Sequence, residues 1–359
     1  MASAPYLSCR RQEFTLRPPL VTARGQWHQR QTLLVRLHAG DGPDGQGEAA
    51  PLPGYSPDEL PAVERALLAV PRAELAHALD IPTPAGISSA VAALLPAELP
   101  SARFALETAL FDRLGLRLGR PLWSLLREAH AGGAPGLARP VALCSLLPSD
   151  DPAGALTQAL RERELGVQAF KLKIGPDVVQ PAQLELLARL RAALGERVEL
   201  RLDANRSLSG HGLRAVLEQV AVHRPEFVEE PVAQPEPEQL GELACGWALD
   251  ESLQGMDAVT LERWCALGSC RALVLKPTAL GGLGRCASLA AVARAYGKAL
   301  VVSHTLEGPI GWLACVHLAL ALGPSAAAGL WPLPHQAFAP GRIEGGQLVL
   351  PEAPGLGAS

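Results

Sequence analysis

Short apolar runs separated by longer amphipathic stretches dominate the chain from about residue 140 onward. The amphipathic stretches, such as 181–196 and 282–298, repeat apolar residues at the spacing of a helix face. Strand signals that alternate with helices predict a parallel sheet. No GxGxxG motif follows the first run, so the pattern favours a closed (β/α) barrel over an open doubly wound sheet. The predicted strands lie at 141–147, 169–175, 198–205, 226–232, 247–253, 272–278, 299–305 and 327–331.

The part of the chain before residue 100 has a different pattern. Residues 30–40 read as a strand, and the Gly- and Pro-rich residues 41–56 predict a turn and a loop, whereas 59–70 and 86–95 have helical patterns. The amphipathic segment 101–126 is expected to pack between the two parts of the chain. We therefore predict an α+β capping domain and a barrel, with boundaries at 1–98 plus the C-terminal tail 333–359, and at 99–332.

Composition narrows the class of protein further. The 359 residues carry 32 Lys plus Arg against 36 Asp plus Glu, a formal net charge of −4, which argues against a general nucleic-acid binder. No apolar run reaches the length of a membrane span, and the first residues lack the apolar core of a signal peptide, so we expect a cytoplasmic protein with no membrane partner. Seven cysteines without CxxC spacing predict reduced, mostly buried thiols. The oligomeric state stays open, and a homo-oligomer is compatible with the sequence.

Charged side chains stand at the ends of five consecutive predicted strands. In a barrel, catalytic groups project from the C-terminal ends of the strands. Because side chains two positions apart share a face, Lys171 and Lys173 are expected to point into the barrel while Phe170, Leu172 and Ile174 face the helices.

The following strands add carboxylates and a third lysine. Alternation places Arg201, Asp203 and Asn205 on the inner face of the next strand. In the two strands after it, periodicity leaves open which acid of each adjacent pair faces inward. The open choices, and the lysine that ends the strand after them, are Glu229 or Glu230, Asp250 or Glu251, and Lys276.

Three carboxylates on neighbouring strands would repel one another in a low-dielectric interior unless a cation holds them. An all-oxygen donor set favours Mg²⁺, which Mn²⁺ can replace, and leaves positions for water and for a small-molecule carboxylate substrate. The ammonium of Lys171, a nearby divalent cation and partial burial favour the neutral form of Lys173, which can then remove a proton from a carbon next to that carboxylate. Lys276 would lie across the substrate, as a second acid/base or as a fixed cation.

These residues resemble the enolase superfamily, and within it the muconate-lactonizing subgroup. The resemblance covers nearly the whole chain and implies an α/β fold, a (β/α)7β TIM-like barrel with an N-terminal α+β capping domain. It also implies chemistry that members share, in which a Lys or His base works with Mg²⁺ on an enediolate. The motifs that carry it, in the family's order, are KLK at 171–173, LDAN at 202–205, VEEP at 228–231, LDES at 249–252 and LKP at 275–277.

The resemblance resolves the two open choices in favour of the first acid of each pair. It implies that Lys173 is the acid/base, that Lys276 is its partner, and that Lys171 completes the catalytic lysines. The implied metal ligands are Asp203, Glu229 and Asp250. A barrel that only binds would have no reason to keep these five charged positions, and a metal-dependent aldolase or hydrolase would normally supply His ligands or a Schiff-base lysine instead.

The reaction is harder to choose, because one catalytic frame serves several reactions. Residues 45–56, with Arg24 and Gly25 before them, resemble the o-succinylbenzoate synthases of menaquinone biosynthesis, as do 203–209 and 303–311. That resemblance implies dehydration of 2-succinyl-6-hydroxy-2,4-cyclohexadiene-1-carboxylate. Dipeptide epimerases of the subgroup carry a DxD near the last strand, where this chain reads GLWPLPHQ. N-succinylamino acid racemases share most of the remaining pattern, so a racemase, or a chain with both synthase and racemase activities, is the alternative.

Further residues are expected to contact the substrate. Ser303 and the turn that starts at Gly308 follow the seventh strand, where backbone N–H groups would hold the carboxylate of the succinyl tail. Asn205 is expected to reach the substrate, as is Arg201, which would also order the lysines and acids from beneath. His304 is expected to be a packing residue rather than a base. The loops at 18–24 and 51–55 are candidates for a lid.

Overall fold

The molecule begins with an antiparallel sheet, and its central strand, β2 (Gly25–His38), buries alternate residues on one face. The computed structural model describes residues 4–22, 25–131, 139–175, 181–208, 212–323, 326–336 and 340–358. Leu33, Val35 and Leu37 are fully buried on one face of β2, and Arg36 between them is exposed. On either side of it lie β1 (Tyr6–Thr22) and β3 (Gly45–Ala49). The strand predicted at 30–40 is confirmed as part of β2, whereas β1 was not predicted.

Helices cover one face of this sheet and join it to the rest of the molecule. The helix α4 (Pro100–Leu118) packs along β3, and its residues 100–115 are almost all buried. Gly45 and Gly47 make this approach possible, because a Cβ at either position would overlap the carbonyl of Ala109 or Ala105. The expected packing of 101–126 between the two parts is therefore confirmed. The other helices of this part are α1 (Leu60–Leu68), α2 (Arg72–Asp80), α3 (Pro84–Leu94) and α5 (Leu122–Ala131).

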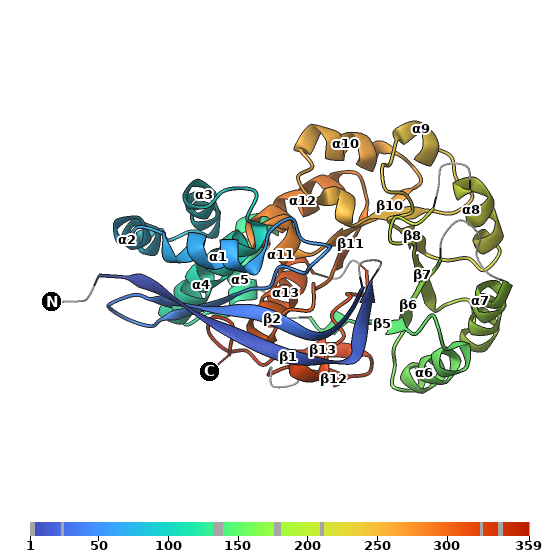
Figure 1. Cartoon of the computed structure of the whole chain (residues 1–359), viewed down its shortest axis with the longest axis horizontal. Helices are drawn as coiled ribbons and strands as arrows, with labels where there is room; N and C mark the ends of the chain where they lie inside the picture. The colour runs from blue at the N-terminus through green and yellow to red at the C-terminus, as the bar shows by residue number, and fades with distance from the viewer. Residues whose placement is uncertain are drawn as a thin grey trace.

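Parallel strands with apolar sequences form the second part of the molecule, and helices cover the outside of their curved sheet (Figure 1). The predicted α/β barrel architecture with an N-terminal capping unit is confirmed. In sheet order the strands are β11 (Ala299–Val302), β10 (Cys270–Leu275), β9 (Trp247–Leu249), β8 (Phe227–Glu229), β7 (Glu199–Asp203), β6 (Ala169–Lys173) and β5 (Cys144–Leu147). The helices that follow them are α6 (Pro152–Glu164), α7 (Pro181–Leu194), α8 (Leu213–Ala221), α9 (Pro237–Leu240), α10 (Ala258–Ala266), α11 (Pro277–Leu280), α12 (Leu283–Ala295) and α13 (Pro309–Leu322).

A short segment, rather than a full strand, joins β11 to β5. The N–H of Gly329 donates to Val302 O, and the N–H of Cys144 donates to Ala328 O. The strand predicted at 327–331 is thus reduced to isolated bridges at Ala328 and Gly329. Prolines at 332 and 334 follow directly, and they have no N–H with which to extend a ladder.

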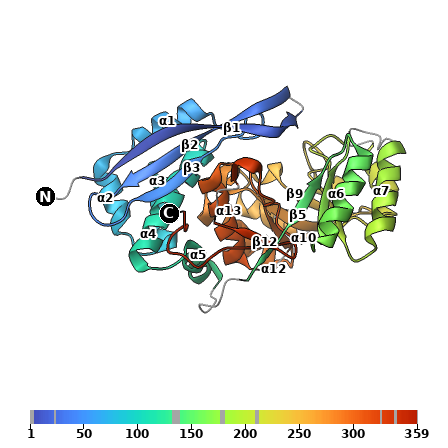
Figure 2. The ribbon, with the colours of Figure 1, turned by 90° about the horizontal axis from the view of Figure 1, so that it is seen from below.

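The C-terminal residues pack against both parts of the molecule, and the last of the described residues lie beside α4 (Figure 2). That this tail completes the capping domain stays a prediction. The short strands β12 (Arg342–Glu344) and β13 (Gln347–Val349) form a hairpin that adds to β4 (Val141–Ala142). Beyond it, Gly355 pairs with Pro121, and Leu356 donates its N–H to Asp112. The domain boundaries at residues 98 and 332 stay predictions.

Two further expectations concern the surface and the thiols. Among the described residues, no helix combines the length and the apolar character needed to cross a bilayer. The cysteines are free thiols, and six of the seven are buried while Cys9 is partly exposed. Their predicted reduced and mostly buried state is confirmed.

Candidate metal and acid/base site

Lys171 brings together the ends of three neighbouring strands inside the barrel. Its Nζ lies 2.9 Å from Asp203 Oδ2 and 3.2 Å from each carboxylate oxygen of Glu229. Asp203 ends β7, Glu229 ends β8, and the two residues pair directly across the ladder. Both acids are almost fully buried. The inward positions predicted for Lys171 and Asp203 from strand alternation are confirmed.

Lys173 is the last residue of β6 and pairs with Asp203 across the ladder. Burial opposes ionisation, but Lys171, Lys276 and Lys173 together hold the pKa of Asp203 below its ordinary value. Unlike Lys171, Lys173 makes none of the side-chain hydrogen bonds or ion pairs found among the described residues. None of the described side chains therefore holds its amine away from a substrate.

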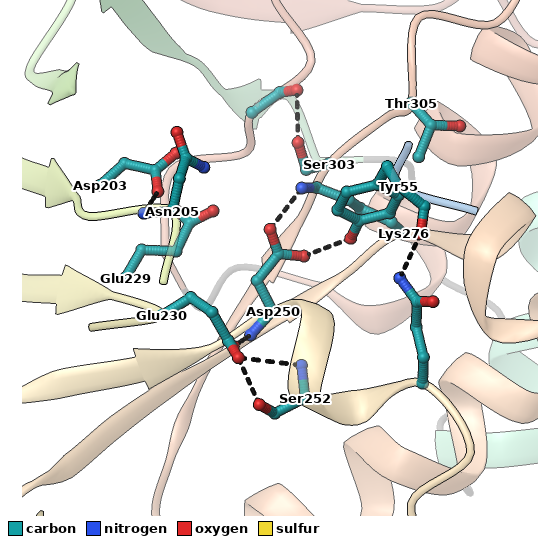
Figure 3. Close-up of polar contacts among 12 residues, drawn as sticks. Tyr55, Asp203, Asn205, Glu229, Glu230, Asp250, Ser252, Lys276, Ser303 and Thr305 are labelled. Carbon is teal, nitrogen blue, oxygen red and sulfur yellow. Dashed lines mark hydrogen bonds and ion pairs between the residues drawn. The ribbon is translucent and has the colours of Figure 1, made fainter. Parts of the chain in front are cut away.

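The two acids that end β8 face different ways (Figure 3). Glu229 faces Lys171, whereas Glu230 accepts hydrogen bonds from the backbone N–H groups of Asp250 and Ser252. The backbone of Glu230 has a φ of 43°, in the left-handed region, which turns its side chain away from that of Glu229. Glu229 is therefore the acid of this pair that joins the charged row, by which we mean the side chains of Lys171, Lys173, Asp203, Glu229, Asp250 and Lys276.

Asp250, directly after β9, meets groups from both parts of the molecule (Figure 3). Its Oδ2 accepts a hydrogen bond from Lys276 Nζ, and its Oδ1 accepts one of 2.7 Å from the hydroxyl of Tyr55. The Lys276 Nζ also lies 4.5 Å from the centre of the Tyr55 ring. Glu251 begins the 3-10 turn η1 (Glu251–Leu253), and its Oε2 has no partner among the described residues. Asp250 is therefore the acid of this pair that contacts the lysine.

Burial and mutual repulsion set the charges of this row. Burial, reinforced by Asp203 and Asp250, raises the pKa of Glu229 to about 8. Burial also raises the pKa of Asp250. Burial alone would lower the pKa of Lys276, but the nearby carboxylates, Asp250 foremost, outweigh it and raise that pKa, so this lysine is held as a cation. At Glu229, repulsion by Asp203 and Asp250 therefore adds to the effect of burial, whereas Lys171 and Lys276 oppose it.

The donor set fits a hard divalent cation such as Mg²⁺. Carboxylate oxygens are the ligands that such an ion prefers, and a cation would offset the repulsion that Asp203 and Asp250 exert on Glu229. Within the described residues no three Asp, Glu, His or Cys side chains already surround one point, and the ammonium of Lys171 lies between Asp203 and Glu229 instead. The three acids, Asp203, Glu229 and Asp250, are the side chains that would hold such a cation.

Two of the predicted substrate contacts lie at the edge of this row (Figure 3). Asn205 is exposed beside Asp203 and Glu229, and its backbone N–H donates to Asp203 Oδ1 over 3.0 Å. Ser303 follows β11, and its hydroxyl donates to Gly329 O over 3.1 Å, which leaves the Ser303 oxygen as an acceptor. Substrate binding by both residues stays a prediction.

Arg201 is not a substrate contact in this structure. Its guanidinium is buried and donates to Glu226 Oε2 and to Ala327 O, each over 2.6 Å, and its Nη2 lies 3.5 Å from Glu199 Oε2. Strand alternation gave the correct face, but Arg201 precedes Asp203 by two residues and therefore lies one layer deeper in the barrel. There it joins β7 to the segment that closes the sheet.

The backbone N–H groups near Gly308, predicted to hold a substrate carboxylate, also have partners within the chain. The N–H of Gly308 donates to Glu48 Oε1 over 2.6 Å, and that of Gly311 donates to Glu48 Oε2 over 2.8 Å. The N-terminus of α13 does bind a carboxylate, as the pattern predicts, but that carboxylate belongs to β3 of the chain itself. These N–H groups are therefore not available to the succinyl tail of a substrate.

Arg30 joins the loop that carries Tyr55 to the loop after β11. Its guanidinium donates to Pro51 O over 2.9 Å and to Ala50 O, and also to Leu306 O over 3.1 Å. The lid candidate at 51–55 thus reaches the site through Tyr55. Of the other lid candidate, residues 23 and 24 lie outside the described residues, as does Ser209 of the DANRSLS motif.

His304 is a neutral residue of the same loop. Burial lowers the pKa of His304 to about 4, and its Nδ1 accepts the N–H of Leu306 over 3.1 Å. These contacts agree with the packing role expected for it. The structure also identifies residues whose roles the sequence did not predict, namely Tyr55, Glu230, Arg30 and Glu48.

Two family models and several known proteins are similar to this chain. Residues 7–127 match the mandelate racemase / muconate lactonizing enzyme N-terminal domain, and residues 155–359 match the enolase C-terminal domain-like family. An o-succinylbenzoate synthase from Thermosynechococcus vestitus is 31% identical over 325 residues, which cover 88% of this chain and 89% of the relative. An N-succinylamino acid racemase from Thermus thermophilus is 30% identical over 359 residues, which cover 96% and 91%.

A solved structure supports the fold. A dipeptide epimerase from Enterococcus faecalis V583, complexed with Mg and the dipeptide L-Leu-L-Tyr, has a TM-score of 0.81 to this chain at 23% identity and 98% coverage of each chain. Because the C-terminal family model alone covers more than half of the residues and the N-terminal model covers most of the remainder, the chain belongs to the enolase superfamily.

Proposed function

We propose that this chain is an o-succinylbenzoate synthase, which removes water from 2-succinyl-6-hydroxy-2,4-cyclohexadiene-1-carboxylate. The observation that carries the proposal is the row of strand ends, in which Lys173 on β6 and Lys276 beyond β10 flank three buried acids on the strands between them. The identity of 31% to a relative of that name, over most of both chains, supports this reaction among those of the superfamily.

Asp203, Glu229 and Asp250 are the residues that would hold Mg²⁺. When bound, the ion supplies positive charge beside the ring carboxylate of the substrate. The amine of Lys173 takes the proton from the ring carbon that bears this carboxylate, and the electron pair moves into the carboxylate to give an enediolate. When the pair returns, the neighbouring carbon–hydroxyl bond breaks, and Lys173 gives its proton to the leaving hydroxyl. The products are o-succinylbenzoate and water.

Lys276 acts in this proposal as a fixed cation. Asp250 and the ring of Tyr55 hold its ammonium in place, and the carboxylates around it favour its charged form. A cation there stabilises the negative charge that develops on the substrate without exchanging a proton. Formation of an aromatic ring makes the dehydration strongly downhill, so one acid/base is sufficient.

Racemisation of N-succinylamino acids is the second candidate, favoured by the relative that is 30% identical over 96% of this chain. In a racemase, Lys276 must itself add or remove a proton on the opposite face of the substrate from Lys173. Lys276 is therefore a fixed cation in the synthase reaction and an acid/base in the racemase reaction.

Both reactions can be measured with the purified chain and Mg²⁺. Dehydration is followed by ultraviolet absorbance with the cyclohexadiene carboxylate, and racemisation is followed by polarimetry with N-succinyl amino acids. We expect Mg²⁺-dependent dehydration that falls about 10³-fold or more in Lys173→Ala. Lys276→Arg keeps the positive charge, so it is expected to retain more dehydration activity than Lys276→Ala.

The outcomes separate the candidates. Dehydration that is lost in Lys173→Ala and partly kept in Lys276→Arg, without racemisation, supports the synthase. Racemisation without dehydration, abolished in Lys276→Arg as well as in Lys173→Ala, overturns it in favour of the racemase. Full dehydration activity in Lys173→Ala contradicts the acid/base assigned here.

A further inference from the structure

Glu230 is a buried acid next to the proposed metal site that the proposed chemistry does not use. Its side chain is only 2% exposed, although it neither faces Lys171 nor contacts Lys276. Its backbone has a φ of 43°, which L-residues other than Gly, Asn and Asp rarely adopt. A strained backbone persists only where the surroundings hold it, so the contacts of this side chain deserve an explanation.

Every contact of the Glu230 carboxylate leads to a loop that follows a barrel strand. Its Oε2 accepts the backbone N–H of Asp250 over 2.7 Å. Its Oε1 accepts the N–H of Ser252 over 3.1 Å, the hydroxyl of Ser252, and Nε of Arg206 over 3.1 Å. Arg206 comes after β7, Glu230 after β8, and Asp250 and Ser252 after β9. One carboxylate thus joins three neighbouring strand ends, and Figure 3 shows its bonds to Asp250 and Ser252.

The bond to the N–H of Asp250 has a direct geometric consequence. The N–H of Asp250 belongs to the peptide group directly before the Asp250 side chain, and the N–H of Ser252 belongs to the second peptide group after it, so one carboxylate holds the backbone on both sides of Asp250. That side chain is the one that meets Lys276 and Tyr55. Side chains that hold metal ligands in place typically change metal affinity about 10- to 100-fold when they are removed.

We infer that Glu230 is a positioning residue, which holds the backbone of Asp250 so that its carboxylate is directed at the divalent cation. The inference rests on the proposed function, in which Asp250 is a metal ligand. In Glu230→Gln an amide NH₂ replaces one carboxylate oxygen, and it then faces an N–H or O–H donor on whichever side it lies. The Asp250 loop is expected to shift as a result.

A purely structural role would give the same contacts without any effect on the metal, and Glu107 provides the matched control. It is also 2% exposed, and it accepts the N–H groups of Leu283 and Gly284 and the hydroxyl of Ser88. Glu107 therefore accepts the same kinds of donor as Glu230, two backbone N–H groups and a serine hydroxyl, at the N-terminus of α12. Glu107→Gln removes an equivalent buried carboxylate away from the charged row.

The experiment compares Mn²⁺ binding and thermal unfolding of four full-length proteins. Free Mn²⁺ is measured by electron paramagnetic resonance during titration of the wild type, Glu230→Gln, Glu107→Gln and Asp250→Asn. We expect Kd for Mn²⁺ to rise about 10-fold or more in Glu230→Gln and in Asp250→Asn. In Glu107→Gln, Tm is expected to fall while Kd stays within twofold of the wild type.

Each result has a separate meaning. Weaker Mn²⁺ binding in Asp250→Asn but unchanged binding in Glu230→Gln overturns the inference and leaves the metal site standing. Unchanged binding in Asp250→Asn overturns the proposed metal site itself. Equal weakening in Glu230→Gln and Glu107→Gln shows a general loss of folding and also overturns the inference.

A milder variant covers the case in which Glu230→Gln does not fold. Ser252→Ala removes only the hydroxyl that donates to Glu230 Oε1 and keeps the backbone N–H bonds. It is expected to raise Kd for Mn²⁺ by less than Glu230→Gln, with a Tm close to that of the wild type. A wild-type Kd in a folded Ser252→Ala protein counts against the positioning role.

Discussion

The hydroxyl and the ring of Tyr55 contact different residues. The hydroxyl donates to Asp250, and the ring lies against the ammonium of Lys276. The turn that carries it is held by hydrogen bonds from the N–H groups of Tyr55 and Ser56 to Leu52 O. A residue of the N-terminal part is thereby fixed onto the charged row of the barrel.

The two contacts of Tyr55 can be separated by mutation. Tyr55→Phe keeps the ring against Lys276 but removes the hydrogen bond to Asp250, so we expect kcat/KM to fall about 10-fold with little change in Tm. Tyr55→Leu removes both contacts and is expected to lose more activity. Steady-state kinetics and thermal unfolding of both variants test this.

Tyr6→Phe is the control, because Tyr6 is 39% exposed and lies at the start of β1. It is expected to behave as the wild type in both measurements. A Tyr55→Phe protein with wild-type kcat/KM would show that the hydrogen bond to Asp250 has no part in the reaction.

Helix α13 is tied to the first part of the molecule at both its beginning and its middle. Its N-terminus binds Glu48 of β3, and its His317 accepts the N–H of Trp123 on Nδ1 and donates from Nε2 to Leu356 O. Burial lowers the pKa of His317 to about 4. The imidazole is therefore neutral in the folded protein down to low pH.

This histidine makes stability depend on pH in a predictable direction. Below pH 6.5 the unfolded chain binds a proton at His317, whereas the folded chain does so only near pH 4. The contribution to the free energy of unfolding is thus fully present above pH 6.5 and falls by up to about 3 kcal/mol as the pH drops to 4. Urea unfolding of the wild type and of His317→Gln across this range measures it.

The difference between the two proteins is the informative quantity. Burial raises the pKa of Glu107 to about 7, so that acid changes stability in the opposite direction over a similar range. Its effect is present in both proteins and cancels in the difference. A difference in unfolding free energy that stays constant from pH 6.5 to pH 4 would show that His317 is not protonated on unfolding.

Five strand ends of the barrel were predictable because the apolar runs that form these strands stop at charged residues. The run ending at Asp203 shows this, since a carboxylate inside a core strand has no local reason to exist. The position of Arg201 beneath the acids was predictable, but its partners Glu226 and Ala327 O were not, because a period of two gives the face of a strand and not the groups that lie opposite it. β1 was missed because its middle, from Arg10 to Glu13, is polar.

Arg30 links both parts of the molecule through backbone carbonyls. It is 3% exposed and donates to Ala50 O and Pro51 O of one loop and to Thr305 O and Leu306 O of the other. Arg30→Lys keeps the charge but supplies a compact ammonium in place of a planar fork with five donors. Several buried carbonyls then lose their partner, each at a cost of about 1–3 kcal/mol.

We therefore expect Arg30→Lys to be less stable by at least about 2 kcal/mol and to have a kcat/KM reduced about 10-fold or more, because Tyr55 loses its support. Chemical unfolding and steady-state kinetics measure the two effects. Arg36→Lys, an exposed change on the same strand, is the control. Loss of stability without any loss of activity would separate this link from the catalytic site.

Contacts between the two parts of the molecule, such as those of Arg30, could not be predicted from the sequence. Gly308 lies at the start of a helix, and the pattern correctly predicts a carboxylate there. Its actual partner, Glu48, is 260 positions away in the chain, and no local pattern connects the two. The roles of Arg30 and Tyr55 depend on the same approach of the two parts and became visible only in the folded molecule.

The pairing of Gly355 with Pro121 also has a consequence for the order in which the chain is made. The helices α4 and α5 leave the ribosome before the barrel does, and Asp112 Oδ2 can already accept the N–H of Gln46, yet Asp112 Oδ1 and the N–H of Leu122 receive their partners only when residues 355 and 356 arrive. The first part of the molecule to be synthesised is thus among the last to be completed. A nascent chain halted within the barrel would lack these contacts. Asp112 Oδ1 and the N–H of Leu122 would then have no partner from residues 355 and 356.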